Sequence, residues 1–425
     1  MPTPPKYNAK KKIMDTTTPL QHPENSQRVL LVDALRGFAL MGLFLVHSIE
    51  LFELYWQNPV DSLVHDVIFF LFAGKAYAIF AMLFGVSFFI IMDKQAQKGV
   101  DFRLRFAWRL AILFALGTLN SMVYSGEVLQ VLAGYGFFLI LAYRIPSKWL
   151  ILIAIAFLLT PHLIYHYWAA MQNLPGANDK PYSWILYEQT AAVWTKGTLP
   201  EVLAFNVTTG SLAKWFFFFD GNRGFQLFGL FLIGLVIGRA GLLVKPVAFT
   251  RLRKQLLVGA ILGAIMLFAV QKYLGTPEVK ALWPEGNMAK WYLDETVGGY
   301  FCFAFMTILV LSFIAFYQKK IGQKILGILA PVGRMSLTIY VSQSLCCVPF
   351  FYGYGLGMYD KLSQLQALLI GIAFFSLQVM FAHWWLKRFH YGPLEWCWRA
   401  ATYLTVDVPF VKSNEKERQS LANKN

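Results

Sequence analysis

Residues 35–47 read LRGFALMGLFLVH and place Arg36 and His47 inside the first long apolar stretch of the chain. An ionisable side chain in a membrane-spanning helix is costly unless it faces a cavity or a partner, so this pair predicts a functional site. The step of eleven residues makes about three helical turns, so both side chains are expected on one face, roughly 16 Å apart along the axis. A cation near one membrane surface and a titratable base toward the other would result.

The composition of the whole chain indicates an integral membrane protein. Of its 425 residues, 57% are hydrophobic, 17% are aromatic and only 14% are charged, which is too apolar for an ordinary soluble protein of this length. The formal charge of +15 would suit a nucleic-acid partner, but cytoplasmic loops of membrane proteins also collect Lys and Arg. The distribution of the charges favours this second explanation, so the expected partner is the lipid bilayer and no nucleic acid.

Ten apolar stretches are long enough to cross a membrane as helices, since a helix needs about 20 apolar residues to do so. They lie near residues 33–51, 67–92, 107–124, 127–143, 149–168, 215–238, 255–271, 296–317, 328–350 and 365–386. The stretches are continuous and lack apolar/polar alternation, which favours helices over a β-barrel. The predicted fold class is an all-α bundle of about ten transmembrane helices, with longer outer loops at 169–214 and 272–295.

The connections on the N-terminal side of these helices carry most of the Lys and Arg residues. By the positive-inside rule both termini are therefore expected in the cytoplasm. The predicted organisation is a polar cytoplasmic segment at residues 1–28, a membrane domain at 29–404 and a cytoplasmic tail at 405–425. The expected location is the bacterial cytoplasmic membrane.

Polar residues within the apolar segments form the candidate site. His47 suits a general base or an acyl acceptor, because its side chain titrates near neutral pH. Glu127, in the short outer connection SGEVLQ, would orient it. Arg36 has the planar fork that suits phosphate groups, and Arg334, at about the same depth, would complete a donor-binding clamp. Structural alternatives stay open: Arg36 could pair with Asp33 at the helix start, and His47 could be a hydrogen-bonded packing residue.

A second set of polar residues is expected to line a pore or cavity. Ser336, Tyr340 and Gln343 recur at helical spacing in GRMSLTIYVSQS, and such stripes face the interior of a membrane bundle. Lys75 would either join them or extend toward the membrane surface. The four cysteines lack CxxC or Cys/His spacing, so the sequence predicts no metal site and no bound cofactor.

Several stretches together resemble one known family. They are DALRGFALMGLFLVHS, AGKAYAIFAMLFG, SGEVLQVLAGYG, GRMSLTIYVSQS and the C-terminal block GPLEWCWR. These are similar to the bacterial YeiB-like membrane proteins, catalogued as a domain of unknown function (418). The resemblance runs from about Val29 to Leu404, and the domain-of-unknown-function region corresponds to about 240–404.

That family is grouped, more distantly, with transmembrane acyltransferases, including the acyltransferase-three enzymes and the lysosomal heparan-glucosaminide acetyltransferase. In the acyltransferase-three enzymes, ten residues of the first helix separate an Arg or Lys from a His, and Arg36 and His47 match this pattern. The resemblance implies an acyl-CoA-type donor from the cytoplasm and an extracytoplasmic glycan or lipid of the cell envelope as acceptor. The predicted function is therefore O- or N-acyl transfer, of acetyl above all. A transporter or flippase is the alternative, and a noncatalytic scaffold is a third.

Overall fold

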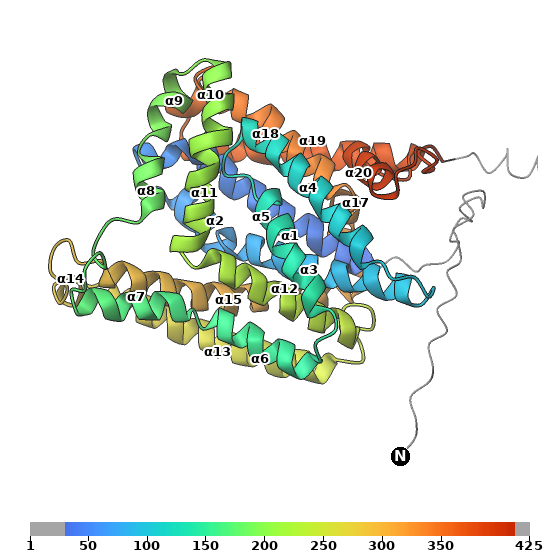
Figure 1. Ribbon diagram of the computed structural model, residues 1–425, viewed down its shortest axis with the longest axis horizontal. Coiled ribbons are helices and arrows are strands. Elements are labelled where there is room, and N and C mark those ends of the chain that lie inside the picture. The colour runs from blue at the N-terminus through green and yellow to red at the C-terminus, as the bar shows by residue number, and fades with distance from the viewer. Residues whose placement is uncertain (1–29, 413–425) are drawn as a thin grey trace, which may run out of the picture.

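The computed structural model describes residues 30–412, which form helices joined by short connections (Figure 1). In chain order the helices are α1 Leu30–Ile49, α2 Leu63–Phe72, α3 Lys75–Ala96, α4 Arg103–Val123, α5 Leu129–Ala142, α6 Ser147–Leu158, α7 Pro161–Met171, α8 Tyr182–Tyr187, α9 Thr190–Lys196, α10 Leu199–Phe205, α11 Ser211–Asp220, α12 Arg223–Ala240, α13 Thr250–Leu274, α14 Pro277–Lys280, α15 Ala289–Tyr317, α16 Lys320–Leu326, α17 Ala330–Arg334, α18 Ser336–Phe351, α19 Gln364–Arg388 and α20 Pro393–Tyr403, and the shorter helical turns are η1 Leu51–Gln57, η2 Asn206–Gly210, η3 Gly327–Leu329 and η4 Met358–Asp360. The predicted N-terminal segment 1–28 and residues 413–425 of the predicted tail at 405–425 lie outside the described residues.

Nine helical stretches within residues 30–412 are long and apolar enough to cross a membrane, and a tenth is added if one sharply bent helix pair is counted as a single span. The predicted all-α fold with about ten spans is therefore confirmed. The bent pair, Lys320–Arg334 and Ser336–Phe351, turns by 78° at Met335 and corresponds to the predicted span at 328–350.

Two predicted boundaries are wrong. The expected outer loop at 169–214 is largely helical, and Leu199–Asp220 is itself long and apolar enough to span a membrane. Polar residues in the middle of this helix interrupt the apolar run in the sequence. One of them, Asn206, is nevertheless fully buried, and its side-chain oxygen accepts a hydrogen bond from Trp194 Nε1 at 2.9 Å. Conversely, the predicted fourth span is the 14-residue helix α5, which at about 21 Å is shorter than the hydrocarbon layer.

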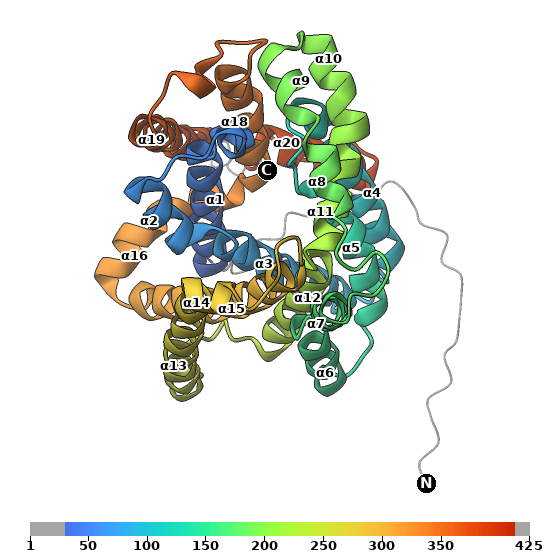
Figure 2. The same ribbon diagram turned by 90° about the vertical axis from the view of Figure 1, so that its left-hand side faces the viewer.

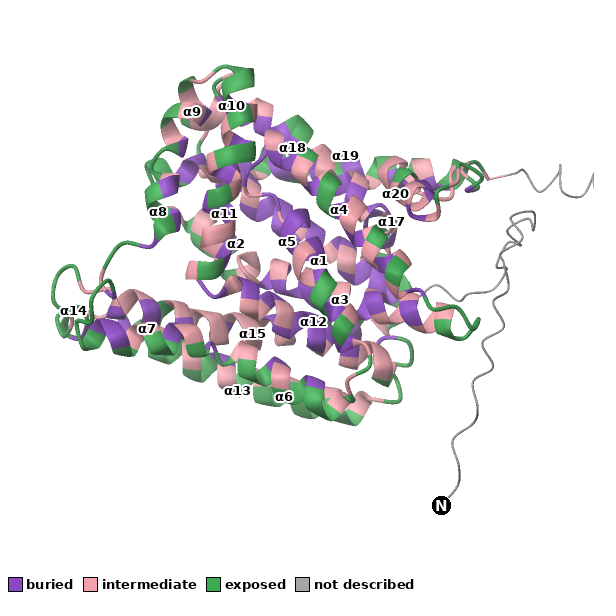
Figure 3. Ribbon diagram, in the orientation of Figure 1, coloured by how far each residue is buried: buried purple, intermediate pink, exposed green. Residues whose placement is uncertain are grey.

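Helix α1 lies inside the bundle, whereas α13 lies on its edge (Figure 2). Most residues of α1 are buried, while α13 is exposed or half-buried along almost its whole length (Figure 3). In a membrane protein, exposed apolar side chains such as those of α13 face lipid. The central position of α1 puts the polar residues of its sequence among other helices and not against lipid.

Glycine residues bring α3 and α12 into backbone contact. A Cβ atom at Gly85 would clash with the carbonyl of Phe231, and one at Gly234 would clash with the carbonyl of Met82. Small residues at such crossings allow close van der Waals packing, which is a main source of helix association in lipid. The α3–α12 pair is therefore a rigid part of the scaffold around α1.

The break between α17 and α18 is stabilised by a side chain from α20. Glu395 accepts hydrogen bonds from the backbone amides of Leu337 at 2.7 Å and Thr338 at 3.1 Å, and from the Thr338 hydroxyl at 2.6 Å. The first amides of a helix have no partner within the helix, so a carboxylate placed there satisfies them. Burial nevertheless raises the pKa of Glu395, and these hydrogen bonds oppose that shift.

Candidate functional site

His47 lies in the last turn of α1, immediately before a strained reversal of the chain. Leu51, Phe52 and Glu53 all adopt left-handed backbone conformations, with φ of 53°, 46° and 83°. Such conformations cost of order 1–3 kcal/mol each outside glycine and cluster at functional sites. The reversal folds η1 back toward α1 and brings Glu50 and Glu53 to the His47 ring.

Four side chains meet at this end of α1. The Nδ1 atom of His47 lies 3.1 Å from the Tyr124 hydroxyl, 3.8 Å from Glu53 Oε1 and 4.0 Å from Glu50 Oε2. The Tyr124 hydroxyl donates its hydrogen to Glu53 Oε1 at 2.5 Å. A phenol carries one hydrogen, so the contact with His47 is a donation from Nδ1–H to the tyrosine oxygen. This tautomer leaves Nε2 with its lone pair, as a general base requires.

The two carboxyl groups share a buried and negatively charged environment. Burial and the neighbouring Glu53 raise the pKa of Glu50 to about 8, against the hydrogen bond from Trp56 and the positive charge of Arg223. Burial also raises the pKa of Glu53. The pair therefore retains a proton at neutral pH. We call His47, Glu50, Glu53, Tyr124 and Arg223 the His47 cluster.

Most of the contacts in the His47 cluster cannot be predicted from local spacing in the sequence. Glu50 follows His47 at a spacing of three, which is a signal that places both on one helical face. Tyr124 directly follows α4 and Arg223 begins α12, and no local spacing connects either residue to α1. Only the tertiary arrangement of the helices brings them to His47.

Glu127, predicted to orient His47, has other partners in the structure. Its fully buried carboxylate accepts hydrogen bonds from the backbone amides of Leu129 and Gln130 at the start of α5. Burial raises its pKa to about 7, while the charge of Lys214 and these hydrogen bonds lower it. Within residues 30–412 no hydrogen bond or ion pair joins Glu127 to His47.

Of the residues predicted to line a cavity, Tyr340 is the one that lies near both Glu127 and the His47 cluster. Its hydroxyl accepts a hydrogen bond from the amide of Val128, next to Glu127, at 3.2 Å. It also interacts electrostatically with Tyr124 of the His47 cluster. Tyr340 therefore lies between the His47 cluster and the start of α5.

At the opposite end of α1, Arg36 donates hydrogen bonds to neighbouring groups of the protein. Its guanidinium donates to Asp33 at 3.0 Å, to the Ser87 hydroxyl at 2.7 Å and to the carbonyl of Gly333 at 3.3 Å. These contacts join α1 to α3 and α17, and the salt bridge with Asp33 that the sequence left open is present. Arg334 follows Gly333 directly, and its guanidinium donates to the carbonyl of His390 at 3.2 Å. The structure thus brings the two arginines to the same region.

The remaining predicted residues contact neighbouring helices. Lys75 is buried, donates to the carbonyl of Phe69 at 3.3 Å and lies 5.5 Å from the centroid of the Phe301 ring. Gln343 donates to the side-chain oxygen of Gln378 at 3.0 Å, which links α18 to α19. Ser336 is half-buried at the break before α18.

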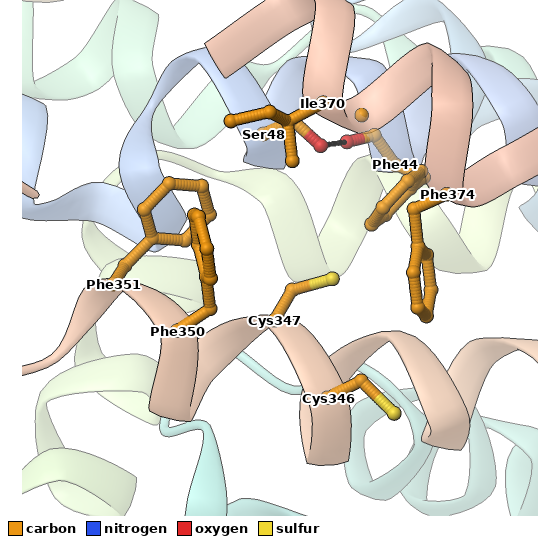
Figure 4. A pocket seen from close by; sticks show the side chains of 9 residues that line it. Phe44, Ser48, Cys346, Cys347, Phe350, Phe351, Ile370 and Phe374 are labelled. Carbon is orange, nitrogen blue, oxygen red and sulfur yellow. Dashed lines mark hydrogen bonds between the residues drawn. The ribbon is translucent and has the colours of Figure 1, made fainter. Parts of the chain in front are cut away.

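A pocket lies between α1, α18 and α19 (Figure 4). Phe44, Phe374 and Cys347 are among its lining residues, and Ser48 is a polar group at its wall. The Ser48 hydroxyl donates to the carbonyl of Phe44 at 2.8 Å, so the pocket offers an apolar surface suited to hydrocarbon. None of the residues predicted to line a cavity contributes to this pocket.

Known proteins of similar sequence match this chain along almost its whole length. Residues 237–405 match the family described as "Protein of unknown function (DUF418)". The chain is 26% identical to the uncharacterized protein YxaH of Bacillus subtilis (strain 168), covering 91% of this chain and 97% of that protein. It is 24% identical to the uncharacterized protein YeiB of Escherichia coli (strain K12), covering 88% and 96%. An uncharacterized 39.9 kDa protein of Bacillus acidopullulyticus is also 24% identical, covering 89% and 94%.

The matched region of the family model contains GRMSLTIYVSQS and GPLEWCWR, which form the broken helix and its cap, while Arg36 and His47 precede it. The resemblance seen in the sequence is confirmed: residues 237–405 match the DUF418 family model, and the chain is similar over most of its length to the YxaH and YeiB proteins.

Proposed function

We propose that this membrane protein is an acyltransferase that uses His47 as a general base. The observation that carries the proposal is the hydrogen-bonded series from His47 Nδ1 to Tyr124 and from Tyr124 to Glu53. A base oriented through its second ring nitrogen is the arrangement that activates hydroxyl and amine nucleophiles. The side chain of His47 is 16% exposed, so an acceptor can approach it.

In the proposed step, Nε2 of His47 removes a proton from an acceptor hydroxyl or amine. The freed electron pair of the acceptor oxygen or nitrogen bonds to the carbonyl carbon of an acyl thioester, and the carbon–sulfur bond breaks. The sulfur leaves with the electron pair and takes the proton from the His47 imidazolium. Glu53 and Tyr124 hold the imidazole and stabilise its charged form during the transfer.

The two ends of α1 support a donor and an acceptor on opposite sides of the membrane. His47 lies at the end predicted to face outward, and Arg36 and Arg334 supply positive charge at the end predicted to face the cytoplasm. A separation of roughly 16 Å suits a long thioester arm that reaches from its phosphates to the base. The acceptor proposed on this basis is a glycan or lipid of the cell envelope.

Purified protein reconstituted in liposomes tests the role of His47. Acetyl-CoA is the probe, and release of the coenzyme A thiol is measured with and without an extract of envelope glycans and lipids. His47→Gln should reduce the rate by about 100-fold or more. His383→Gln is the matched control, because His383 is another histidine in a membrane-spanning helix and bonds the Val379 carbonyl at 2.9 Å. Undiminished turnover in His47→Gln would show that His47 is not the base.

A specific observation favours transport as a second candidate function. The helix pair around Met335 is bent by 78°, and broken spans form the substrate sites of many carriers. However, Glu395 already accepts hydrogen bonds from the first amides of α18, where a carrier would hold an anionic substrate. If wild-type protein consumes no acyl donor but exchanges envelope precursors in counterflow, the acyltransferase proposal fails and the carrier function takes its place.

A further inference from the structure

The block GPLEWCWR attaches α20 firmly to α4. The indole nitrogen of Trp398 donates to the carbonyl of Arg109 at 2.8 Å, and the indole nitrogen of Trp108 donates to the carbonyl of Ala401 at 3.0 Å. These two bonds run in opposite directions between the helices. The two hydrogen bonds fix the position of α20 relative to α4.

Three guanidinium groups lie over aromatic rings at this α4–α20 contact. The Arg109 guanidinium carbon lies 3.6 Å from the Trp398 ring centroid. Those of Arg105 and Arg399 lie 5.5 Å and 5.4 Å from the centroid of the same ring, Tyr403. Arg399 also interacts with the positive charges of Arg109 and of Lys94, which is at the end of α3. We call Arg105, Arg109, Arg399 and Lys94 the α4–α20 cations.

Three other arginines near helix ends donate to protein acceptors, whereas Arg388, at the end of α19, lies over the Trp384 ring at 4.9 Å. Arg103 donates to both oxygens of Asp101, Arg239 donates to the Ile145 carbonyl at 2.6 Å, and Arg253 donates to the Gln318 side chain at 2.6 Å. Across residues 30–412, by contrast, no side-chain hydrogen bond or carboxylate ion pair involves the α4–α20 cations. Stacking on a ring uses the face of a guanidinium and leaves its donor edge open.

The mutual repulsion of the four α4–α20 cations costs free energy, and a bound anion would reduce that cost. All four α4–α20 cations are half-buried, so water screens their mutual repulsion less than on an open surface. Glu395 is a carboxylate that interacts with Arg109, but its oxygens accept the hydrogen bonds at the start of α18. Several guanidinium forks with open edges around aromatic rings match the geometry of phosphate oxygens.

We propose that the α4–α20 cations bind a phosphate group on the side of the membrane where α4 begins. Arg109 and Arg399 donate to the phosphate oxygens, and Arg105 and Lys94 add positive charge. The phosphate belongs either to a lipid headgroup or to a soluble ligand such as coenzyme A. The site is inferred from the cations alone and does not depend on acyl transfer by His47.

Direct binding to the full-length protein in detergent tests the site without any turnover. One arm measures equilibrium binding of radiolabelled coenzyme A. The other counts phosphatidylglycerol and phosphatidylcholine molecules that remain bound in native mass spectrometry. The variant Arg109→Gln/Arg399→Gln is compared with Arg103→Gln, whose guanidinium is already paired with Asp101.

We expect wild-type protein to bind in at least one arm, and the double variant to bind about tenfold more weakly or worse in that arm, since charged hydrogen bonds are lost. Arg103→Gln should stay within about twofold of wild type, because its charge is already neutralised by a partner. Loss confined to the first arm identifies a soluble phosphate ligand, and loss confined to the second identifies a lipid headgroup. Equal binding by wild type and double variant in both arms, or no binding by wild type in either, would overturn the proposal.

If the double variant does not elute as a folded monodisperse protein, Arg105→Gln and Arg105→Lys replace it. Arg105 lies near the start of α4 and, like the other three cations, is half-buried. Glutamine should weaken binding by about threefold or more, while lysine should restore part of the loss because it retains the charge but not the fork. Glutamine binding as tightly as wild type contradicts the site.

Discussion

The Tyr124 hydroxyl lies 3.1 Å from Nδ1 of His47 and donates to Glu53, so one phenol joins the end of α1 to the strained turn that follows it. The turn, with its three left-handed residues, costs free energy that the surrounding structure must offset. In return it places two carboxyl groups beside a histidine in a largely buried environment. Strain of this kind is expected where a protein holds reacting groups in position, and the His47 cluster is therefore the centre of the proposed chemistry.

Tyr124→Phe should lower acetyl-CoA turnover by about 10-fold or more while leaving the protein folded. The variant keeps the buried ring but removes the hydroxyl that receives the His47 Nδ1 hydrogen. The rate is measured as thiol release in liposomes, with Tyr300→Phe as the control, because the Tyr300 hydroxyl bonds the Leu159 carbonyl and the neighbouring Thr160, far from His47 in the sequence. Equal rates in both variants would show that Tyr124 does not position His47.

The stability of the protein should decrease as the pH rises toward 8, in part because of Glu50. The unfolded chain releases this proton near 4.5, whereas the folded protein retains it up to about 8. Between these values the unfolded state binds fewer protons, so stability present below pH 4.5 is lost progressively up to about pH 8. Glu50→Gln should make the melting temperature less dependent on pH.

Thermal unfolding in detergent from pH 5 to pH 8 measures this effect. At pH 8 the Glu50→Gln protein should melt at least about 2 °C above wild type, and Glu53 should preserve a part of the slope. Glu285→Gln is the control, since Glu285 is exposed. A slope in Glu50→Gln as steep as in wild type would be inconsistent with a buried protonated Glu50.

Glu395→Ala should destabilise the fold by about 2 kcal/mol, because the first amides of α18 lose their acceptor and the Thr338 hydroxyl loses its partner. Unfolding in mixed micelles with increasing denaturing detergent measures the free energy. The control is Glu188→Ala, which breaks a salt bridge with Lys180 whose two side chains are 63% and 66% exposed and which should cost little. Similar losses in the two variants would argue against the capping role of Glu395.

Gly234→Ala should destabilise the protein by about 1–3 kcal/mol, because a Cβ there meets the backbone of α3 and forces α3 and α12 apart. Gly259→Ala in α13 is the matched control, since a Cβ at that position has no neighbour within 4 Å. The same detergent unfolding assay compares them. The crossing would not be close if Gly234→Ala and Gly259→Ala were equally stable.

Apolar stretch length predicted most of the fold. The continuous runs identified an all-α membrane protein with about ten spans, and the residues from Arg36 to His47 do lie in one helix. The predictions failed where a polar residue is satisfied at a distance. Asn206 interrupts an apolar run, yet its side chain accepts from Trp194 and donates to the Met122 carbonyl at 3.0 Å, which allows a helix to continue.

Apolar run length and helical period are local properties, so the sequence alone predicts a helical, membrane-embedded chain in which Arg36 and His47 lie about three turns apart on one helix. The contacts of these two residues are visible only once the helices are packed together. Tyr124 reaches His47 from 77 positions along the chain, and Arg36 bonds Gly333 across 297. Contacts of this kind depend on how whole helices pack, and no local spacing encodes them.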